Sequence, residues 1–412
     1  MSITEYVRSE QFKIQCVGLR SSAEPKAAWY SGSDVEDVIR SIDWDNTGLL
    51  CHHTQFDGLI LQHHFGIVPA YYYDTLSMAR PLHGGGIAND LDTIAKCYGG
   101  QGKQGDVLGQ TKGIRDLSDE LLQLLGQYCA QDVDEMWTAF NGMYPRYPAL
   151  ELDLIHYTIR AYCDPVIQVD KKLARQIYEQ EKQARLDLLE KVGVNDKTLR
   201  SRPQFAQLLR DLGVEPPTKP SPADSAKRTF AFAKNDLAYQ ELQRHSDQRV
   251  RDLCEARLIA TSSIEETRSA RVLSHADPAL PIYLNYGQAH TLRWTGGDKM
   301  NPQNFSRESD LRHCMRPPKG YKFVIVDSSQ IEARVNATLA GEEELVQAFR
   351  DGEDIYVVFA GEEIYHRPIN KKDNPLERFV GKTCILGLGF QMGADKFQYT
   401  LESGSQGPPV TL

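Results

Sequence analysis

The sequence predicts a mixed α/β protein in which strands and helices alternate first and helices dominate later. Residues 1–145 alternate short β-type runs with stretches of helical apolar spacing. Residues 146–285 are charged and carry apolar residues at helical spacing. Residues 286–412 contain an apolar run that ends at an aspartate and precedes a helix signal. A chain of 412 residues has room for two or three domains.

The first part has the element order of an α/β domain. Two strands are expected, at 12–19 and 47–52, and helical regions are expected at 56–65 and 117–140. Glycines mark two loops, at 84–86 and 99–105.

Carboxylates stand at three positions of this part. HHTQFDG places His53 and Asp57 at the opening of a helix, and YCAQD places Tyr128 and Asp132 on one helix face. YYYDT ends a strand at Asp74, where an aspartate often caps the following turn. We therefore expect Asp74 to be structural.

The second part is expected to be a helical connector. A long amphipathic helix is predicted at 166–192 and further helix at 237–273. A proline-rich loop, EPPTKPSP, is expected between them at 215–222.

The third part holds the two most informative stretches. FVIVDSSQIEAR, at 323–334, predicts an apolar strand ending at Asp327, with Glu332 and Arg334 on the next helix. RFVGKTCILGLGFQMG, at 378–393, spaces Arg378, Lys382, Leu386 and Phe390 four apart, so they lie on one broad helix face. That face is cationic at its start and apolar, then aromatic, further on. An ordinary strand-to-helix turn followed by an unrelated amphipathic helix is the alternative interpretation.

These stretches resemble motifs A and B of the family A DNA polymerases. D-x-S-x-I-E-x-R matches motif A and R-x-x-x-K-x-x-x-L-G-x-x-F matches motif B, in the family's order. The resemblance implies template-directed DNA synthesis on a primer–template with deoxynucleoside triphosphates. It also implies that Asp327 binds Mg²⁺ or Mn²⁺, that Arg378 and Lys382 neutralise the triphosphate, and that Arg334 contacts DNA. Phe390 would stack near the templating base pair, and Glu332 would exclude ribonucleotides.

The first part resembles the 3′–5′ proofreading exonuclease of the same family, which has a ribonuclease H-like fold. The resemblance implies that Asp57 and Asp132 are metal ligands and that Tyr128 places the attacking water. His53 stands where the family carries asparagine, and the D-x-E of the first exonuclease motif is absent. We therefore expect Met1 to be an internal position of a longer protein.

Further DNA contacts follow from the resemblance. ARLIATSSIEETR would form the part of the thumb that grips the primer–template backbone, through Arg257, Ser262 and Ser263. Thr291 to Asn304 matches a T-x-R…N-x-Q-N signature, which implies that Arg293 and Asn304 contact primer or template. A polar turn with a capping asparagine is the alternative for Asn304.

The resemblance implies that this chain covers part of a right-hand polymerase. Residues 1–145 would be the exonuclease-like domain, 146–285 the connector and thumb, and 286–412 the palm and start of the fingers without motif C. Leu386, where well-known members have an aromatic residue, puts discrimination at the sugar 3′ position in doubt. Three alternatives remain open: a non-catalytic primer–template binding module, a split polymerase completed by a second polypeptide, and a stand-alone exonuclease.

Composition constrains the partners, the metal or redox sites and the location expected for this protein. The net charge of −9 provides no global basic field for nucleic acid, so local patches must supply one. Eight scattered cysteines without a C-x-x-C pair disfavour a zinc or redox site. No apolar run is long enough to span a bilayer, so we expect no membrane partner and a cytoplasmic location in a bacterial or phage-infected cell.

Overall fold

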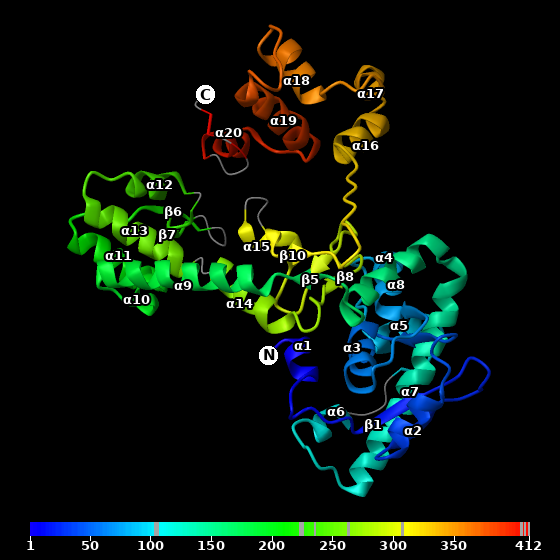
Figure 1. The fold of residues 1–412 in the computed structure, drawn as a ribbon. Helices are drawn as coiled ribbons and strands as arrows, with labels where there is room; N and C mark the ends of the chain where they lie inside the picture. The colour runs from blue at the N-terminus through cyan, green and yellow to red at the C-terminus, as the bar shows by residue number, and fades with distance from the viewer. Residues whose placement is uncertain are drawn as a thin grey trace. The chain divides into compact units, whose positions relative to one another are not determined.

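The computed structural model describes residues 1–102, 107–221, 226–234, 236–261, 264–305, 309–403, 407 and 409–410. The chain divides into two compact units, each built from two separate segments (Figure 1). The first unit comprises residues 1–181 and 264–322, and the second comprises 182–263 and 323–412. The boundaries of these two units differ from those of the three parts predicted from the sequence. In the described residues, every helix is too short or too polar to cross a membrane.

The N-terminal segment of the first unit alternates strands and helices, as the sequence predicts. Its elements are α1 (Ile3–Val7), β1 (Cys16–Leu19), β2 (Ala28–Ser31), α2 (Asp34–Ser41), β3 (Gly48–Cys51), α3 (Thr54–Ile60), the π-helical turn η1 (Leu61–Phe65), β4 (Tyr71–Asp74), α4 (Thr75–His83), α5 (Leu91–Cys97), α6 (Val107–Thr111) and α7 (Asp119–Met143).

The rest of this unit is mainly helical. It contains the 3₁₀ turn η2 (Tyr144–Arg146), α8 (Ala149–Cys163), β5 (Gln168–Val169), the start of α9 (Lys171–Val192), α14 (Ile264–His275), β8 (Leu284–Asn285), β9 (Thr295–Gly296), the 3₁₀ turn η3 (Pro302–Asn304), α15 (Asp310–His313) and β10 (Met315–Arg316).

The β1–β2 hairpin packs on the long helix α7. The two strands pair antiparallel, with Val17 opposite Tyr30. Gly126 on α7 lies so close to the Trp29 ring that a Cβ would overlap it, and Gly18 on β1 lies against Cys129. Small residues on both sides therefore let the helix approach the hairpin closely.

β3 and β4 form a parallel pair joined through α3, which is a β–α–β unit. Asp74, at the end of β4, is only 2% exposed and caps α4 by accepting from the backbone N–H of Ser77 at 3.0 Å. It also accepts from the backbone N–H groups of His53 at 2.6 Å and Thr54 at 3.1 Å. These bonds confirm that Asp74 is structural, because its oxygens hold the start of α3 against the start of α4.

The core of the first unit lies between α3, α4, α7 and α8. Its buried members include Leu59, Tyr72, Met78, Met143, Ile155, Ile159 and Tyr162. In the described residues, strands occur only in pairs, and the N-terminal segment contains the pairs β1–β2 and β3–β4.

Residues 182–263 of the second unit form a helical cluster with one small hairpin. The elements are the end of α9, α10 (Asp196–Arg200), α11 (Arg202–Asp211), β6 (Thr218–Pro220), β7 (Arg228–Phe230), α12 (Leu237–Gln243) and α13 (Gln248–Thr261). Phe205, Phe232 and Tyr239 pack together in its core, and the Tyr239 hydroxyl donates to the backbone carbonyl of Cys254 at 3.0 Å.

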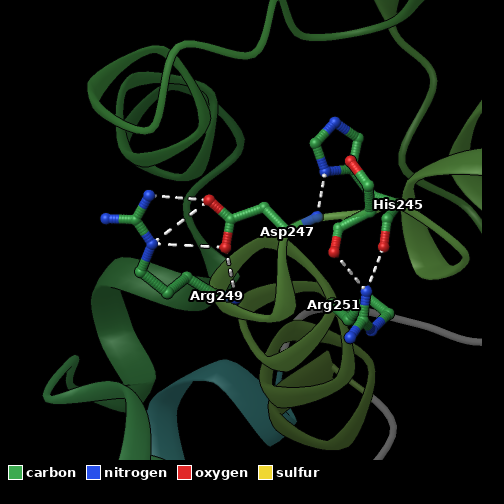
Figure 2. Close-up of polar contacts among 5 residues, drawn as sticks. His245, Asp247, Arg249 and Arg251 are labelled. Carbon is green, nitrogen blue, oxygen red and sulfur yellow. Dashed lines mark hydrogen bonds and ion pairs between the residues drawn. The ribbon is translucent and has the colours of Figure 1, made fainter.

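Polar contacts fix the turn between α12 and α13 (Figure 2). Asp247 accepts from the backbone N–H of Arg249 at 2.8 Å and forms an ion pair with its guanidinium at 2.6 Å. Hydrogen bonds from the Arg249 side chain and backbone lower the pKa of Asp247 to about 2. Arg251 donates to the carbonyls of His245 and Ser246, so the first turn of α13 is anchored on both sides.

Residues 323–412 contain α16 (Ile331–Ala340), α17 (Glu343–Arg350), α18 (Ile355–Phe359), the π-helical turn η4 (Ala360–Ile364), α19 (Pro375–Gly389) and α20 (Ala394–Glu402). α16, α17, α18 and α19 share one core, which contains Ala333, Ala337, Phe349, Ile355 and Tyr356, with Ile385 packed against it.

Several sequence-based element predictions need correction. The strand expected at 12–19 covers only Cys16–Leu19, and the helix expected at 166–192 begins at Lys171 after the short strand β5. The proline-rich loop contains β6, because Thr218–Pro220 pairs with β7. The region 237–273 is divided among α12, α13 and α14 rather than forming one stretch.

The strand expected before Asp327 is absent. Residues 323–326 have no strand assignment, and Ile325 and Val326 are 86% and 88% exposed. A strand needs a neighbour to accept and donate backbone hydrogen bonds, and none of the described residues pairs with this segment.

Candidate active site

The predicted motif A helix is α16, which begins four residues after Asp327. Gln330 takes a left-handed conformation, with φ of 55°, immediately before the helix. The Arg334 side chain turns back to donate to the carbonyl of Ser329 at 2.8 Å and lies over the Phe349 ring at 4.4 Å. These contacts set the direction in which the Asp327 segment leaves the helix.

α16 packs directly against α19, the predicted motif B helix. Ile385 of α19 contacts the core formed in part by Ala333 and Ala337 of α16. At the end of α19, Gly389 approaches the Asn336 side chain, where a Cβ would lie 3.3 Å from its amide nitrogen. Two stretches far apart in the sequence therefore belong to one helical body.

Arg378 lies in the first turns of α19 and is already paired. Its Nε donates to the Asp354 carboxylate at 2.7 Å, and its guanidinium lies 5.3 Å from the centre of the Tyr356 ring. Asp354 also caps α18 by accepting from the backbone N–H of Tyr356. The pair joins the starts of α18 and α19 and holds the guanidinium in place, while its remaining N–H groups can still donate.

The other predicted residues of this face are more accessible. Lys382 is exposed and has no ion pair with a described residue, so its ammonium group can meet an anion. Leu386 is half-buried on the same helix. Phe390 stands just past the helix end as its C-cap, and its ring is 69% exposed. The four-residue spacing thus gives the expected order of a cation, an apolar side chain and an aromatic ring.

The glycines after Lys382 have different roles. Gly387 lies against the Met392 side chain, with a Cβ position 3.2 Å from its sulfur. Gly389 ends α19 beside α16, whereas Gly393 lies outside the helix as the N-cap of α20. A side chain at position 389 would therefore have to displace the amide group of Asn336.

Asp327 is exposed, and no described residue donates a hydrogen bond to it. Glu332 follows in the first turn of α16 and is half-buried. The described residues contain no group of three or more histidine, cysteine, aspartate or glutamate side chains that could hold a metal ion. Asp327 can supply one carboxylate ligand, but these residues do not by themselves fit a two-ion site.

Asp57, the predicted exonuclease ligand, lies on α3 in a largely apolar environment. Burial raises its pKa to about 6, and the negative charge of Asp74 adds to the increase. The thiol of Cys51 on β3 donates a hydrogen bond to the Asp57 carboxylate, and burial raises the pKa of that thiol. The neighbours of Asp57 are therefore the Cys51 thiol and the Asp74 carboxylate, whose oxygens already accept backbone hydrogen bonds.

Tyr128 and Asp132 both lie on α7, as the Y-x-x-x-D spacing predicts. Tyr128 is buried and Asp132 is half-buried. Asp57 and Asp132 do not take part in a metal-binding cluster of three or more such side chains within the described part of the chain.

His53 is the left-handed N-cap of α3, and its Nε2 lies 2.7 Å from the hydroxyl of Tyr283. Burial lowers the pKa of His53. Its contacts thus join the N-terminal segment to residue 283 of the same unit.

The predicted thumb contacts are only partly accessible. Arg257 is 4% exposed and lies over the rings of Phe205 at 4.5 Å and Phe232 at 5.0 Å. This burial argues against a direct grip on a duplex backbone. Ser262 and Ser263 lie outside the described residues.

Of the predicted palm contacts, Arg293 and Asn304 are both exposed. The capping asparagine of this turn is Asn301, whose side chain accepts from the backbone N–H of Gln303 at 3.0 Å. Asn304 is therefore not needed as the cap and can meet a ligand.

Sequence reasoning missed Asp354, the partner of Arg378. The signal was available, because an aspartate directly before the apolar run IYVVF is a typical helix N-cap. Its pairing with Arg378 was not predictable, since that contact depends on how α18 packs against α19.

Comparisons with known proteins agree with the motif assignment. Residues 167–406 match the profile of DNA polymerase family A. DNA polymerase I of Synechocystis sp. is 36% identical over 124 residues, and that of Pseudomonas aeruginosa is 24% identical over 361 residues, or 78% of this chain. The DNA polymerase of Bacillus phage SP02 is 32% identical over 143 residues, or 34% of this chain.

A solved structure shows the same fold. The POL domain of Pol1 from M. smegmatis, in complex with DNA primer-template and dNTP, aligns with 97% of this chain and 71% of its own, with a TM-score of 0.65 and 18% identity. The Synechocystis match covers 28% of this chain, and the aligned parts span 12%, 36% and 20% of the Synechocystis, Pseudomonas and phage proteins. Because the family profile covers more than half of its residues, this chain belongs to DNA polymerase family A.

Proposed function

We propose that this protein takes part in template-directed DNA synthesis, adding deoxynucleotides to a primer 3′-hydroxyl. The observation that carries the proposal is the packing of α16 against α19, which puts Asp327, Glu332 and Arg334 on the same body as Arg378 and Lys382. The proposed partners are primer–template DNA and deoxynucleoside triphosphates. The proposed setting is the cytoplasm of a bacterial or phage-infected cell.

The charges on α19 suit a triphosphate. Lys382 presents an exposed ammonium group one turn beyond Arg378, whose guanidinium is held by Asp354. Together they offset the charge that builds on the β- and γ-phosphates as the 3′-oxygen bonds to the α-phosphorus and pyrophosphate leaves. The exposed Phe390 ring provides a surface on which a base pair can stack. Glu332 would stand beside the sugar and exclude a 2′-hydroxyl.

Mg²⁺ or Mn²⁺ would lower the cost of deprotonating the primer hydroxyl. Asp327 is the residue proposed to hold it, and its exposed carboxylate is accessible to an ion. Since the described residues do not complete such a site, further ligands must come from outside them, for example from a second polypeptide.

Proofreading ancestry is proposed for residues 1–145. The β3–α3–β4 unit with Asp57 on its helix, and the pair of Tyr128 and Asp132 on α7, support a ribonuclease H-like origin. The thumb is proposed to lie within 146–285, and the palm with the start of the fingers within 286–412. Arg293, Asn304 and Arg334 are proposed DNA contacts.

Primer extension tests the polymerase proposal. Incorporation of labelled deoxynucleotide would be measured for this chain, and for the longest polypeptide its flanking reading frame encodes, in the presence of Mg²⁺. Asp327→Asn is expected to lower kcat by about 10² or more, and Lys382→Ala to raise the KM for deoxynucleotide by about tenfold. Lys396→Ala, an exposed lysine of α20, is the matched control.

Binding measurements separate the alternatives. The binding module would be favoured if every protein tested bound primer–template but incorporated no nucleotide, and if Asp327→Asn left that binding unchanged. Metal-dependent cleavage of single-stranded DNA that Asp57→Ala abolishes would favour the exonuclease instead.

A further inference from the structure

A basic pocket of about 490 Å³ lies within residues 182–263, away from both polymerase motifs in the sequence. All of its charged lining residues are cations: Arg200, Arg202, Lys234 and Arg257. The other described lining residues are Phe232, Ala233, Leu258, Ile259 and Thr261, so no carboxylate of a described residue lines the pocket.

Arg257 is the buried cation among the lining residues of this pocket. This residue is 4% exposed, and its guanidinium lies 4.5 Å from the centre of the Phe205 ring and 5.0 Å from that of the Phe232 ring. One terminal nitrogen donates to the backbone carbonyl of Leu199, while Nε is buried without a partner among the described residues. A buried cation that lacks both an anion and a full set of acceptors is costly, so the site is short of negative charge.

The neighbouring side chains do not remove this deficit. Arg200 is paired with Asp196 at 2.5 Å, whereas the one side-chain hydrogen bond of Arg202 to a described residue is a 3.4 Å contact with the Thr229 hydroxyl. Lys234 is exposed and has no ion pair with a described residue. Burial, and the like charge of Arg202, lower the pKa of Arg257.

Asp236, two residues after Lys234, is also occupied by other partners. Asp236 forms an ion pair with Lys219 at 2.6 Å and accepts from the backbone N–H of Ala233 at 2.8 Å. Its charge is therefore committed to the hairpin and to the turn before α12, not to the pocket.

We propose that this pocket binds a terminal phosphate group, held by Arg257 at its base and by Arg202 and Lys234 at its mouth. Guanidinium groups match phosphate oxygens with paired, charge-assisted hydrogen bonds, and an ammonium group adds a point charge. A phosphodiester within a duplex would meet the exposed cations Arg200, Arg202 and Lys234, but not the buried Arg257. A terminal phosphate is small enough to enter and reach the buried Arg257.

Two sources share this chemistry: a free anion such as inorganic phosphate or pyrophosphate, and the 5′-phosphate end of a DNA strand. The site is distinct from the triphosphate face of α19, so it does not depend on the proposed polymerase function.

Isothermal titration calorimetry tests the proposal. The intact chain would be titrated with inorganic phosphate, with pyrophosphate, and with one oligodeoxynucleotide carrying either a 5′-phosphate or a 5′-hydroxyl. EDTA and a constant ionic strength would exclude metal and screening effects. Saturable binding is expected, and Arg202→Gln and Lys234→Gln should each weaken it about tenfold, the effect of a lost charge-assisted hydrogen bond.

Arg210→Gln is the matched control, because Arg210 lies on the same helix, α11, but does not line the pocket. Thermal unfolding of each variant confirms that it is folded, and Asp327→Asn should bind phosphate as the wild type does. A preference for the 5′-phosphorylated strand would assign the strand end, and equal binding of both strands alongside phosphate binding would assign a free anion. Absence of saturable phosphate binding, or equal binding by Arg202→Gln, Lys234→Gln and wild type, would overturn the proposal.

Discussion

At the residue scale, two aspartates of the first unit show how environment decides a role. Asp74 accepts from three backbone N–H groups, so its charge stabilises the fold. Asp57 is half-buried near the thiols of Cys51 and Cys163, and loss of solvation raises its pKa to about 6. The sequence predicted the cap at Asp74 correctly, whereas the role of Asp57 as a metal ligand stays a prediction. The loss of solvation at Asp57 depends on the packing of α3.

The pKa of Asp57 predicts a specific pH dependence. In the unfolded chain a carboxyl ionises near pH 3.9, so between about pH 4 and 6 the folded state binds more protons. The stabilising contribution of protonated Asp57 is therefore present below pH 4 and is lost as pH rises through 6. Asp57→Asn should change stability little at pH 4 and increase the free energy of unfolding by about 1 to 3 kcal/mol at pH 8.

Thermal unfolding from pH 4 to 8, followed by circular dichroism in EDTA, measures this effect. Asp45→Asn, an exposed aspartate of the same unit, is the control. Parallel profiles for wild type and Asp57→Asn would show that the Asp57 carboxyl is solvated in the folded protein.

At the element scale, the candidate active site depends on close contacts between helices. A Cβ on Gly381 of α19 would overlap the Tyr356 carbonyl oxygen and lie 2.8 Å from the Ala360 Cβ. The same helix carries Arg378, whose bond to Asp354 ties the starts of α18 and α19 together. The absence of a side chain at Gly381 is thus what lets the motif B helix reach its position.

Gly381→Ala is expected to destabilise this region although alanine is the better helix former. The gain in helix propensity is at most about 1 kcal/mol, whereas overpacking against backbone costs about 1 to 3 kcal/mol. Hydrogen–deuterium exchange should show faster exchange in peptides from α18 and α19. Gly393→Ala is the control, since a Cβ there meets nothing within 4 Å. Unchanged exchange in Gly381→Ala would show that the two helices can separate without cost.

At the scale of the whole molecule, the largest departure from expectation is the segment before Asp327. Phe323, Val324, Ile325 and Val326 are consecutive, apolar and exposed, and the described residues provide no strand beside them. Exposed apolar backbone with unused hydrogen-bonding groups favours association with other chains.

The double substitution Val324→Lys with Ile325→Thr should therefore reduce self-association of the purified chain. Sedimentation velocity over a concentration series measures it, with Val166→Lys as the control at another exposed valine. If wild type and the double variant sediment alike as monomers, this segment does not drive association.

Much of the local structure could be predicted from the sequence. Spacing alone placed Tyr128 with Asp132 on α7, and Arg378, Lys382 and Leu386 on α19, because helix periodicity is a local property. Phe390 lies one residue past the end of α19, because helix propensity does not determine the exact last residue of a helix. Family membership was also evident, since motif A and motif B are each a continuous stretch of the chain.

What the sequence by itself determined was therefore the helices that carry motif residues and the family to which the chain belongs. Tertiary structure alone decided that Arg257 is buried beneath two aromatic rings, that Arg378 pairs with Asp354, and that the residues before Asp327 remain unpaired. The physical reason is that burial, ion pairing and strand formation each require a partner distant in sequence, whose position no local pattern encodes.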